Sequence, residues 1–382
     1  MYKIVLYDTS NFIDFPIGGQ LTSIRNFLRY VAESENIYCK QILLVGVTTE
    51  EKQVGSLQKI EIANQKFDFL PVLYRNKNLS DVRKSLRMEY LKGLFKYTNK
   101  ICVTPKTINY IHTPEAYIQI KICHPISKTV VFSHGNFWNM QSGFRFYKNN
   151  KLIKLFFDKF IFHLLKHADL IFTLDKNCTV QYMLNTNKVR QIDNSIVLPE
   201  SYGLSKEKHI PLKLLFVGRL SKIKRVDEII KAMALHSKGE VQLLIVGDGE
   251  ERECLETLAQ RESVDHNVLF MGAVSPDEVG EYMRNNDILI MNSQFEGKPM
   301  TIIEALSYGM PIVTTPVGGI AELVINHHNS EYTDGTSQSI SDAICTIASN
   351  YTYYSNNAFE AAKDYDYQKV NAEIWDFLVN LQ

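Results

Sequence analysis

Short apolar runs alternate with amphipathic helical segments along residues 213–324, and this alternation most limits the fold. Each run ends in glycine or a polar residue, as buried parallel strands do where they leave a sheet. The runs lie at 213–221, 241–249, 267–272, 287–292 and 311–315. Strands that alternate with helices build βαβ units, so the sequence predicts an α/β fold with a doubly wound parallel sheet.

The N-terminal half repeats this rhythm with longer insertions. Its predicted strands are residues 3–7, 41–47, 101–105, 129–134 and 170–174. The polar stretch 193–213, which contains two prolines, is predicted to be the hinge between two α/β halves. A chain of 382 residues is long enough for two domains that each bury a core.

The composition limits the partners and the compartment. Lysine plus arginine number 42 and aspartate plus glutamate number 42, so no excess of positive charge favours nucleic acid as a partner. The six cysteines form no C-x-x-C pair, which indicates neither a zinc site nor a redox motif and fits a reducing compartment. The first residues read as a strand and not a signal peptide, and no uncharged apolar run is long enough to span a bilayer. We therefore expect a cytoplasmic, soluble protein, with peripheral contact to the inner face of the cell membrane as a further hypothesis.

The stretch 293–313, SQFEGKPMTIIEALSYGMPIV, is predicted to form a loop, a short helix and the next strand. Pro299 suits the first helical position, because its missing N–H would have no helical partner there. The free N–H groups of Met300, Thr301 and Ile302, together with the helix dipole, predict an anion site. This site would lie at the carboxyl ends of the strands, where open α/β sheets bind their ligands.

Two glutamates flank this helix start. Glu304 lies about one and a half turns into the helix, where its carboxylate can accept two hydrogen bonds from a vicinal diol such as a ribose. Glu296 lies in the loop, nearer the reacting end of a nucleotide. Two cations stand at the end of the first predicted strand of this half, residues 213–221: Arg219 comes directly after Gly218, and Lys224 comes five residues later. Both are placed to reach a diphosphate, Arg219 with a planar fork and Lys224 with a point charge.

Four successive blocks resemble those of the retaining GT-B glycosyltransferases, the large fourth family. They read FVGRLSKIKRVDEIIKA, LLIVGDGEERECLETLA, VLFMGAVSPDEV and FEGKPMTIIEALSYGMPIVTTPVGGIAELV. Glu296 and Glu304 match the family's E-x7-E signature. The N-terminal half is similar in IGGQ, in the two histidine-bearing strand ends of NYIHTPEA and VVFSHGNFW, and in QIDNSIV, where Ser195 stands in place of the usual glycine.

The resemblance implies an α/β GT-B fold, in which two Rossmann-like doubly wound domains face a cleft. Residues 1–197 would form the acceptor-binding domain, and residues 198–365 the nucleotide-sugar-binding domain. The helix within 366–382 would pack back on the first domain.

The resemblance also implies the roles of individual residues. Arg219 and Lys224 would hold the diphosphate, Glu304 the ribose, and Glu296 would lie near the donor sugar. The backbone N–H groups of Gly18 and Gly19 would approach the phosphates, and His134 would line the sugar site and join Arg219, Lys224 and Glu296 in catalysis. The remaining donor-binding residues would be Gly218, Gly297, Met300 and Thr301. Lys298 and Pro299 depart from the family's usual aromatic residue and glycine, which leaves the donor sugar open.

The implied activity is metal-independent transfer of a hexosyl group, with retention, from a UDP- or GDP-sugar to a hydroxyl of a saccharide or lipid-linked saccharide. No further cofactor is implied, because the nucleotide sugar is the donor substrate. The assembly of bacterial surface polysaccharide or glycolipid would suit such an enzyme. A non-catalytic nucleotide-sugar-binding protein of the same fold is the alternative, and a nicotinamide-dependent oxidoreductase is disfavoured because VGDGEE lacks the G-x-G-x-x-G spacing.

Simple structural roles remain open beside these assignments. Each site residue also fits an ordinary loop charge, tight turn or core histidine, and His112 is evenly balanced between the two interpretations. Two basic, apolar stretches fit either a surface for anionic lipid or ordinary packed helices. Their cations are Arg83, Lys84, Arg87, Lys92 and Lys96 in the first, and Lys151, Lys154 and Lys159 in the second.

Overall fold

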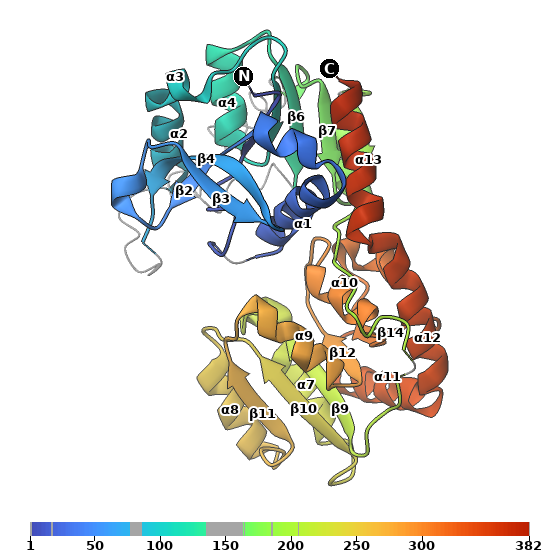
Figure 1. Cartoon of the computed structure of the whole chain (residues 1–382). Helices are drawn as coiled ribbons and strands as arrows, with labels where there is room; N and C mark the ends of the chain where they lie inside the picture. Colours follow the sequence, from blue (N-terminus) through green and yellow to red (C-terminus); the bar gives the residue numbers. More distant parts are fainter. Residues whose placement is uncertain are drawn as a thin grey trace. The chain divides into compact units, whose positions relative to one another are not determined.

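A computed structural model describes residues 2–16, 18–76, 86–134, 163, 165–184, 186–204 and 206–381. The chain divides into two compact units (Figure 1). Unit 1 comprises Met1–Asn194 and Tyr367–Gln382, and unit 2 comprises Ser195–Asp366. The predicted boundaries between the two domains lie after residue 197 and after residue 365. Within the described residues, no helix is both long enough and apolar enough to cross a membrane.

Unit 1 is built on an eight-stranded sheet of order β3-β4-β2-β1-β5-β6-β7-β8, in which only the β3/β4 pair is antiparallel. The strands are β1 Ile4–Tyr7, β2 Ile42–Thr48, β3 Gln58–Ile62, β4 Gln65–Tyr74, β5 Ile108–Ile111, β6 Lys128–Ser133, β7 Leu170–Thr173 and β8 Val189–Gln191. Its helices are α1 Gly19–Ser34, α2 Leu86–Lys96, α3 Thr98–Ile101, α4 Pro114–Cys123, α6 Lys176–Met183 and α13 Tyr367–Asn380.

One predicted strand of unit 1 is wrong. Residues 101–105 end a short helix and enter a turn, and the strand that follows is β5, Ile108–Ile111. Cys102 has a positive φ of 57°, which no strand residue adopts, and Pro105 lacks the N–H that a central strand needs. Hydrophobicity alone does not show that a turn separates the apolar residues at 101–103 from the strand β5.

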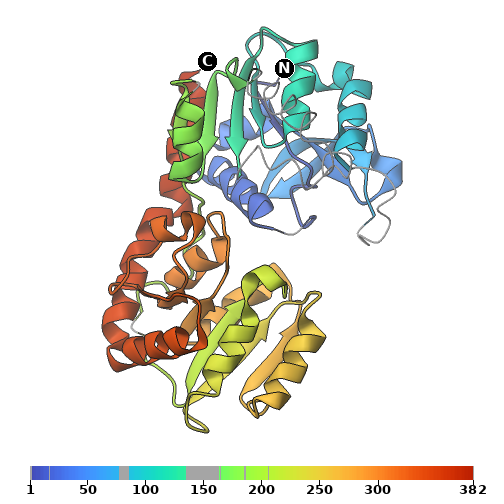
Figure 2. The same cartoon turned by 180° about the vertical axis from the view of Figure 1, so that it is seen from behind.

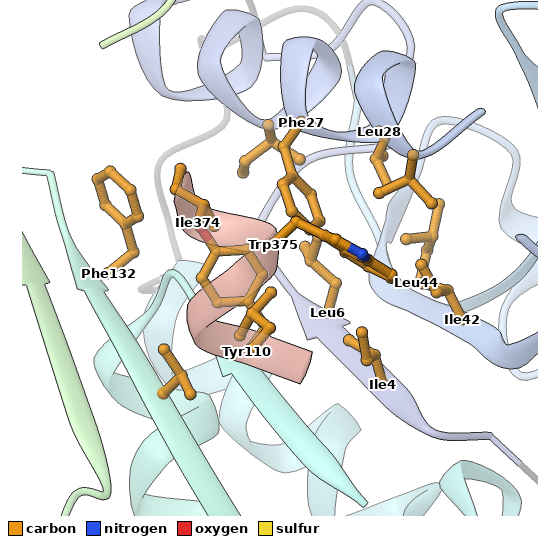
Figure 3. Close-up of a cluster of buried hydrophobic side chains, with 14 of the residues drawn as sticks. Ile4, Leu6, Phe27, Leu28, Ile42, Leu44, Tyr110, Phe132, Ile374 and Trp375 are labelled. Atoms are coloured by element: carbon orange, nitrogen blue, oxygen red, sulfur yellow. The ribbon is translucent and has the colours of Figure 1, made fainter. Parts of the chain in front are cut away.

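Helices cover both faces of the unit 1 sheet. On one face, α1 and α13 pack over the strands, and Trp375 of α13 lies among Phe27, Leu6 and Leu44 (Figure 3). The Trp375 ring also meets Tyr38 edge to face, with ring centroids 5.1 Å apart. Buried residues of α2, α4 and α6 form the core on the other face. The last helix of the chain thus belongs to the hydrophobic core of unit 1.

Unit 2 contains a six-stranded, fully parallel sheet of order β11-β10-β9-β12-β13-β14. The strands are β9 Leu212–Val217, β10 Val241–Val246, β11 Val268–Gly272, β12 Ile288–Met291, β13 Ile312–Thr314 and β14 Ser330–Tyr332. The helices are α7 Val226–Met233, α8 Arg252–Arg261, α9 Pro276–Arg284, α10 Met300–Ser307, α11 Ser337–Ser349 and α12 Tyr351–Ala362. The core over one face contains α7, α8 and α11, and the core over the other contains α9, α10 and α12 (Figures 1 and 2).

The strand order fixes where each unit can bind a ligand. In unit 2 the chain proceeds from β9 outward to β10 and β11, then returns to start β12 on the other side of β9. Open α/β sheets bind ligands at such a reversal, outside the carboxyl ends of the two strands. Unit 1 has the same reversal between β1 and β5. The residues that follow β9, β12, β1 and β5 are therefore the first to consider.

Candidate functional site

The reversal in unit 2 brings Lys224 and Glu296 into an ion pair. Lys224 ends the short 3₁₀ helix Lys222–Lys224 after β9, and Glu296 lies in the loop after β12. The Lys224 Nζ donates to Glu296 Oε1, and the Ser293 hydroxyl donates to the same oxygen at 2.6 Å. The side chains of Lys224 and Glu296 are 21% and 12% exposed, respectively, so solvent screens this ion pair only partly. The loops after β9 and β12 thus present one ammonium and one carboxylate together.

A pair of glycines holds the Glu296 loop in place. A Cβ on Gly318 would lie 1.8 Å from the Glu296 carbonyl oxygen, and one on Gly319 would lie 2.6 Å from the Gly297 carbonyl oxygen. The Gly319 N–H donates to that Gly297 oxygen at 2.8 Å. No role was predicted for Gly318 or Gly319, although paired glycines in the loop that follows a strand are a signal of close backbone approach.

Lys298 lies in the same loop and is almost wholly buried. Its side chain is 2% exposed, and its Nζ is 3.6 Å from Glu322 Oε2. Glu322 ends the short helix Gly318–Glu322 that begins with the glycine pair. The departure from the family at position 298 therefore adds a second link between this loop and the glycine turn.

Arg219 pairs with a different carboxylate from the one that Lys224 binds. Its guanidinium donates to Glu250 at 3.1 and 3.2 Å, with side chains 74% and 54% exposed. The loop that carries it packs on the turn after β10, where a Cβ on Gly247 would lie 1.9 Å from the Gly218 carbonyl oxygen. The stretch VGDGEE is thus a strand-to-helix turn against which the loop after β9 packs. Solvent screens an exposed ion pair, which therefore contributes little to stability, so Arg219 can leave Glu250 at little cost.

Helix α10 begins at Met300, one residue later than predicted, with Pro299 in the preceding capping position. No side chain caps this helix start, so its first N–H groups remain available for an anion. Ile302 and Ile303 are buried, whereas Met300, Thr301 and Glu304 are half-buried and lie on the other side of the helix. The predicted donor-binding residues of α10 therefore share one face.

Burial raises the pKa of Glu304 from 4.5 to about 7. Among the described residues no hydrogen bond or ion pair reaches its carboxylate, so nothing offsets the desolvation of the ionised form. Between pH 4.5 and 7 the folded chain binds more protons at this site than the unfolded chain does, so this group lowers stability as the pH rises.

We expect Glu304→Gln to stabilise unit 2 relative to the parent chain at pH 8 and not at pH 5. Glutamine mimics the protonated acid, which is the form that the folded chain favours. Urea unfolding followed at both pH values measures the difference. Glu262→Gln, at an exposed position at the end of α8, is the matched control for loss of a carboxylate. A Glu304→Gln effect equal at the two pH values would contradict the expectation.

The reversal in unit 1 gathers a second group of polar residues. Asp8 follows β1 and accepts a hydrogen bond from the Gln20 amide in the first turn of α1. The same amide lies 3.5 Å from the His112 carbonyl oxygen after β5. His112 Nδ1 in turn lies 2.6 Å from His134 Nε2 after β6. Four neighbouring segments of unit 1 are thereby tied together at one edge of the sheet.

The glycine loop lies at the start of α1. Gly18 occupies the capping position, with an extended backbone and no side-chain cap, and Gly19 is the first helical residue. A Cβ on Gly18 would meet nothing within 4 Å, so steric crowding within the described residues does not require glycine there. The Gln20 contacts fix this helix start relative to β1 and β5.

Burial sets the charges of the unit 1 group. It raises the pKa of Asp8 to about 6, although hydrogen bonds from Ser10, Gln20 and Thr9 oppose the shift. It lowers the pKa of His134 to about 3 and that of His112 well below its ordinary value. Both imidazoles are therefore neutral near pH 7. No role was predicted for Asp8 or Gln20; an aspartate directly after the first strand was the available signal.

The sequence model of the family described as glycosyl transferases, group 1, matches residues 204–364, which is most of unit 2. This match assigns unit 2 to the group 1 glycosyltransferases. A Methanocaldococcus jannaschii protein described as an uncharacterized glycosyltransferase is 27% identical over 82% of this chain and 81% of its own length. The lipopolysaccharide 1,6-galactosyltransferase of Salmonella typhimurium is 33% identical over 34% of this chain and 37% of that protein.

Solved structures match the whole group 1 glycosyltransferase chain. The Anabaena HepE protein in complex with UDP has a TM-score of 0.70 and 18% identity, and the match covers 99% of this chain and 100% of that one. The fold is that of the GT-B glycosyltransferases, with two parallel-sheet α/β domains. The predicted family and fold class are thus confirmed.

The basic stretches of the glycosyltransferase give mixed results. Arg87 lies 3.6 Å from Glu115, Lys92 pairs with Glu89 at 2.8 Å, and Lys96 lies over the Tyr97 ring. These contacts favour the packed-helix interpretation for the part of the first stretch that the structure describes. Five predicted cations lie outside the described residues: Arg83, Lys84, Lys151, Lys154 and Lys159.

No group of three or more histidine, cysteine, aspartate or glutamate side chains suited to a metal ion occurs among the described residues.

Proposed function

We propose that the chain transfers a hexosyl group, with retention of configuration, from a UDP- or GDP-sugar to a hydroxyl of a saccharide acceptor. The observation that carries this proposal is the Lys224–Glu296 pair beside the uncapped start of α10, at the strand reversal of unit 2. A cation and free backbone amides gathered at one sheet edge suit a diphosphate. HepE, which shares the fold, has been solved with UDP and with UDP-glucose.

The proposed chemistry places the departing diphosphate at this edge. An ammonium has three donors, and Glu296 occupies one of them, which leaves Lys224 able to bind a phosphate oxygen. As the bond between the anomeric carbon and the β-phosphate oxygen breaks, charge grows on the diphosphate. Lys224, Arg219 and the amides of Met300 and Thr301 would stabilise that charge. The acceptor oxygen then bonds to the anomeric carbon, and its proton passes to a phosphate oxygen.

The remaining predicted residues receive their roles from the same proposal. Glu304 would bind the ribose hydroxyls from the half-buried face of α10 that it shares with Met300 and Thr301, and Glu296, with Gly297 beside it, would face the donor sugar. Gly218 would let the loop after β9 approach the phosphates. In unit 1, the glycine loop at Gly18 and Gly19 and the imidazole of His134 would contact the donor, and no metal ion would be required.

A panel of sugar nucleotides tests this proposal. We expect a UDP- or GDP-sugar to raise the melting temperature and to be hydrolysed slowly without an acceptor. Stabilisation without turnover would favour the non-catalytic binding protein, and stabilisation by a nicotinamide dinucleotide alone would favour an oxidoreductase. An unchanged melting temperature with every nucleotide would contradict the proposal.

We expect Glu304→Ala to weaken binding of the nucleotide by about tenfold or more, because a hydrogen bond to a charged group is lost. Titration calorimetry with UDP or GDP measures the change. Because the pKa of Glu304 is about 7, nucleotide affinity in the parent chain should rise between pH 6 and 8 as the carboxylate forms. The exposed Glu253→Ala on α8 is the matched control. Unchanged affinity in Glu304→Ala would remove the ribose assignment.

The acceptor and the cellular setting are also part of the proposal. A saccharide or a lipid-linked saccharide of a surface polysaccharide or glycolipid is proposed as acceptor, because a lipopolysaccharide galactosyltransferase is among the related proteins. Peripheral contact with an anionic membrane stays a prediction from the two basic stretches. Flotation with anionic and with neutral vesicles tests it: binding to neither kind would count against membrane contact.

A further inference from the structure

The two histidines at the unit 1 edge are joined by a hydrogen bond between their imidazole rings. His112 Nδ1 and His134 Nε2 are 2.6 Å apart, and their rings are 4.9 Å apart and inclined by 27°. Phe132 lies beside both rings, with centroids 5.4 Å from His112 and 4.4 Å from His134. The stack holds both rings in place, so a single proton must lie between two fixed nitrogens.

The surroundings of His112 indicate which ring supplies that proton. His112 Nε2 is buried and has no hydrogen-bond partner among the described residues. If His134 were the donor, neutral His112 would carry its own proton on Nε2, as a buried N–H without an acceptor. If His112 is the donor, Nε2 is left as an unpaired acceptor instead. Buried N–H groups without partners are the rarer of the two in proteins, so the geometry favours donation by His112.

Donation by His112 determines what His134 offers to a ligand. With its Nε2 accepting, neutral His134 carries its proton on Nδ1. The His134 side chain is half-buried and makes no other hydrogen bond within the described residues. Within the described residues its Nδ1–H therefore has no acceptor and can donate to an oxygen of a ligand.

We propose that His112 is a positioning residue that fixes His134 as the Nδ1–H tautomer, a hydrogen-bond donor toward an oxygen of the sugar nucleotide. Gln20 supports this arrangement, because its amide links the His112 backbone carbonyl to Asp8. The choice of ligand rests on the proposed function, whereas the tautomer itself is a property of the free protein. The two can therefore be tested separately.

The tautomer is read from the full chain without ligand. Long-range ¹H–¹⁵N correlation spectra of histidine-labelled protein distinguish protonated from unprotonated ring nitrogens, and His134→Asn identifies the His134 signals by their loss. We expect His134 to be protonated on Nδ1 and His112 also on Nδ1. Protonation of His134 on Nε2 would overturn the inference, whether or not the chain turns over any sugar nucleotide.

Two substitutions at position 112 test the consequence for the ligand. His112→Phe keeps a ring in the stack and removes the donor, whereas His112→Asn keeps an N–H near the position of Nδ1. We expect His112→Phe to lower kcat/KM for the donor about threefold to tenfold, the effect of one neutral hydrogen bond, and to yield mixed His134 tautomers. His112→Asn should retain most of the parent kcat/KM and should keep most of His134 as the Nδ1–H tautomer. Equal losses in the two variants, or none in either, would contradict the positioning role.

Nucleotide binding separates this inference from the proposed function. UDP or GDP alone should bind the His112 variants as tightly as the parent chain, because His134 is assigned to the sugar of the donor and not to the nucleotide. Failure of the parent chain to bind any nucleotide would defeat the proposed function and leave the tautomer measurement standing. Circular dichroism melting curves show whether each variant is folded.

Discussion

Replacement of Lys224 by alanine is expected to lower donor turnover by about 10²–10³-fold, the effect of removing one group that stabilises charge in a transition state. Among the described residues, the Lys224 ammonium is the cation that contacts the Glu296 carboxylate. Without it, the diphosphate would leave beside Glu296 with one positive charge fewer. Among the described residues, the carboxylate would lose Lys224 and retain the Ser293 hydroxyl as its partner.

Lys222→Ala is the matched control for the Lys224 substitution. Lys222 begins the same 3₁₀ helix, is exposed, and has no hydrogen bond or ion pair to its side chain among the described residues. Its removal should leave turnover nearly unchanged. Single-turnover hydrolysis of the donor by both variants measures the difference, with melting curves to confirm folding. A Lys224→Ala rate within a fewfold of the parent chain would remove the diphosphate assignment.

The alternation of strands and helices was enough to predict the layers of unit 2. All five predicted strands there correspond to observed ones, since parallel strands buried on both faces read as uninterrupted apolar runs. The strand β14, Ser330–Tyr332, escaped prediction because only three residues form it and they include a serine and a glutamate. Unit 1 was harder, because its edge hairpin of β3 and β4 is partly polar on its outer strand.

The candidate site was predictable residue by residue but not as a set of contacts. Lys224 and Glu296 each follow a strand, which the sequence shows, yet they lie 72 positions apart and only the strand order makes them neighbours. The partner of Arg219 was not foreseen either, because an exposed side chain has many possible positions. Contacts between backbones, such as those of Gly318, depend on the three-dimensional path of the chain.

The glycine turn provides the second large expected effect, because it controls the position of Glu296 through the backbone. Gly318 has a φ of +56°, which a residue with a side chain adopts at a cost of about 1–2 kcal/mol. Its Cβ would also lie 1.8 Å from the Glu296 carbonyl oxygen, so one of the two backbones must move. Overpacking of this kind adds about 1–3 kcal/mol.

We therefore expect Gly318→Ala to destabilise the chain by about 2–5 kcal/mol, the sum of the backbone strain and the overpacking, and to abolish most donor turnover. Gly239→Ala separates the two contributions, because Gly239 has a φ of +83° and a Cβ there would meet nothing within 4 Å. This control should show the backbone strain alone and keep its activity. Urea unfolding and donor hydrolysis measure both quantities. Equal losses of stability in the two variants would mean that the turn yields without displacing Glu296, since the clash would then add nothing to the strain.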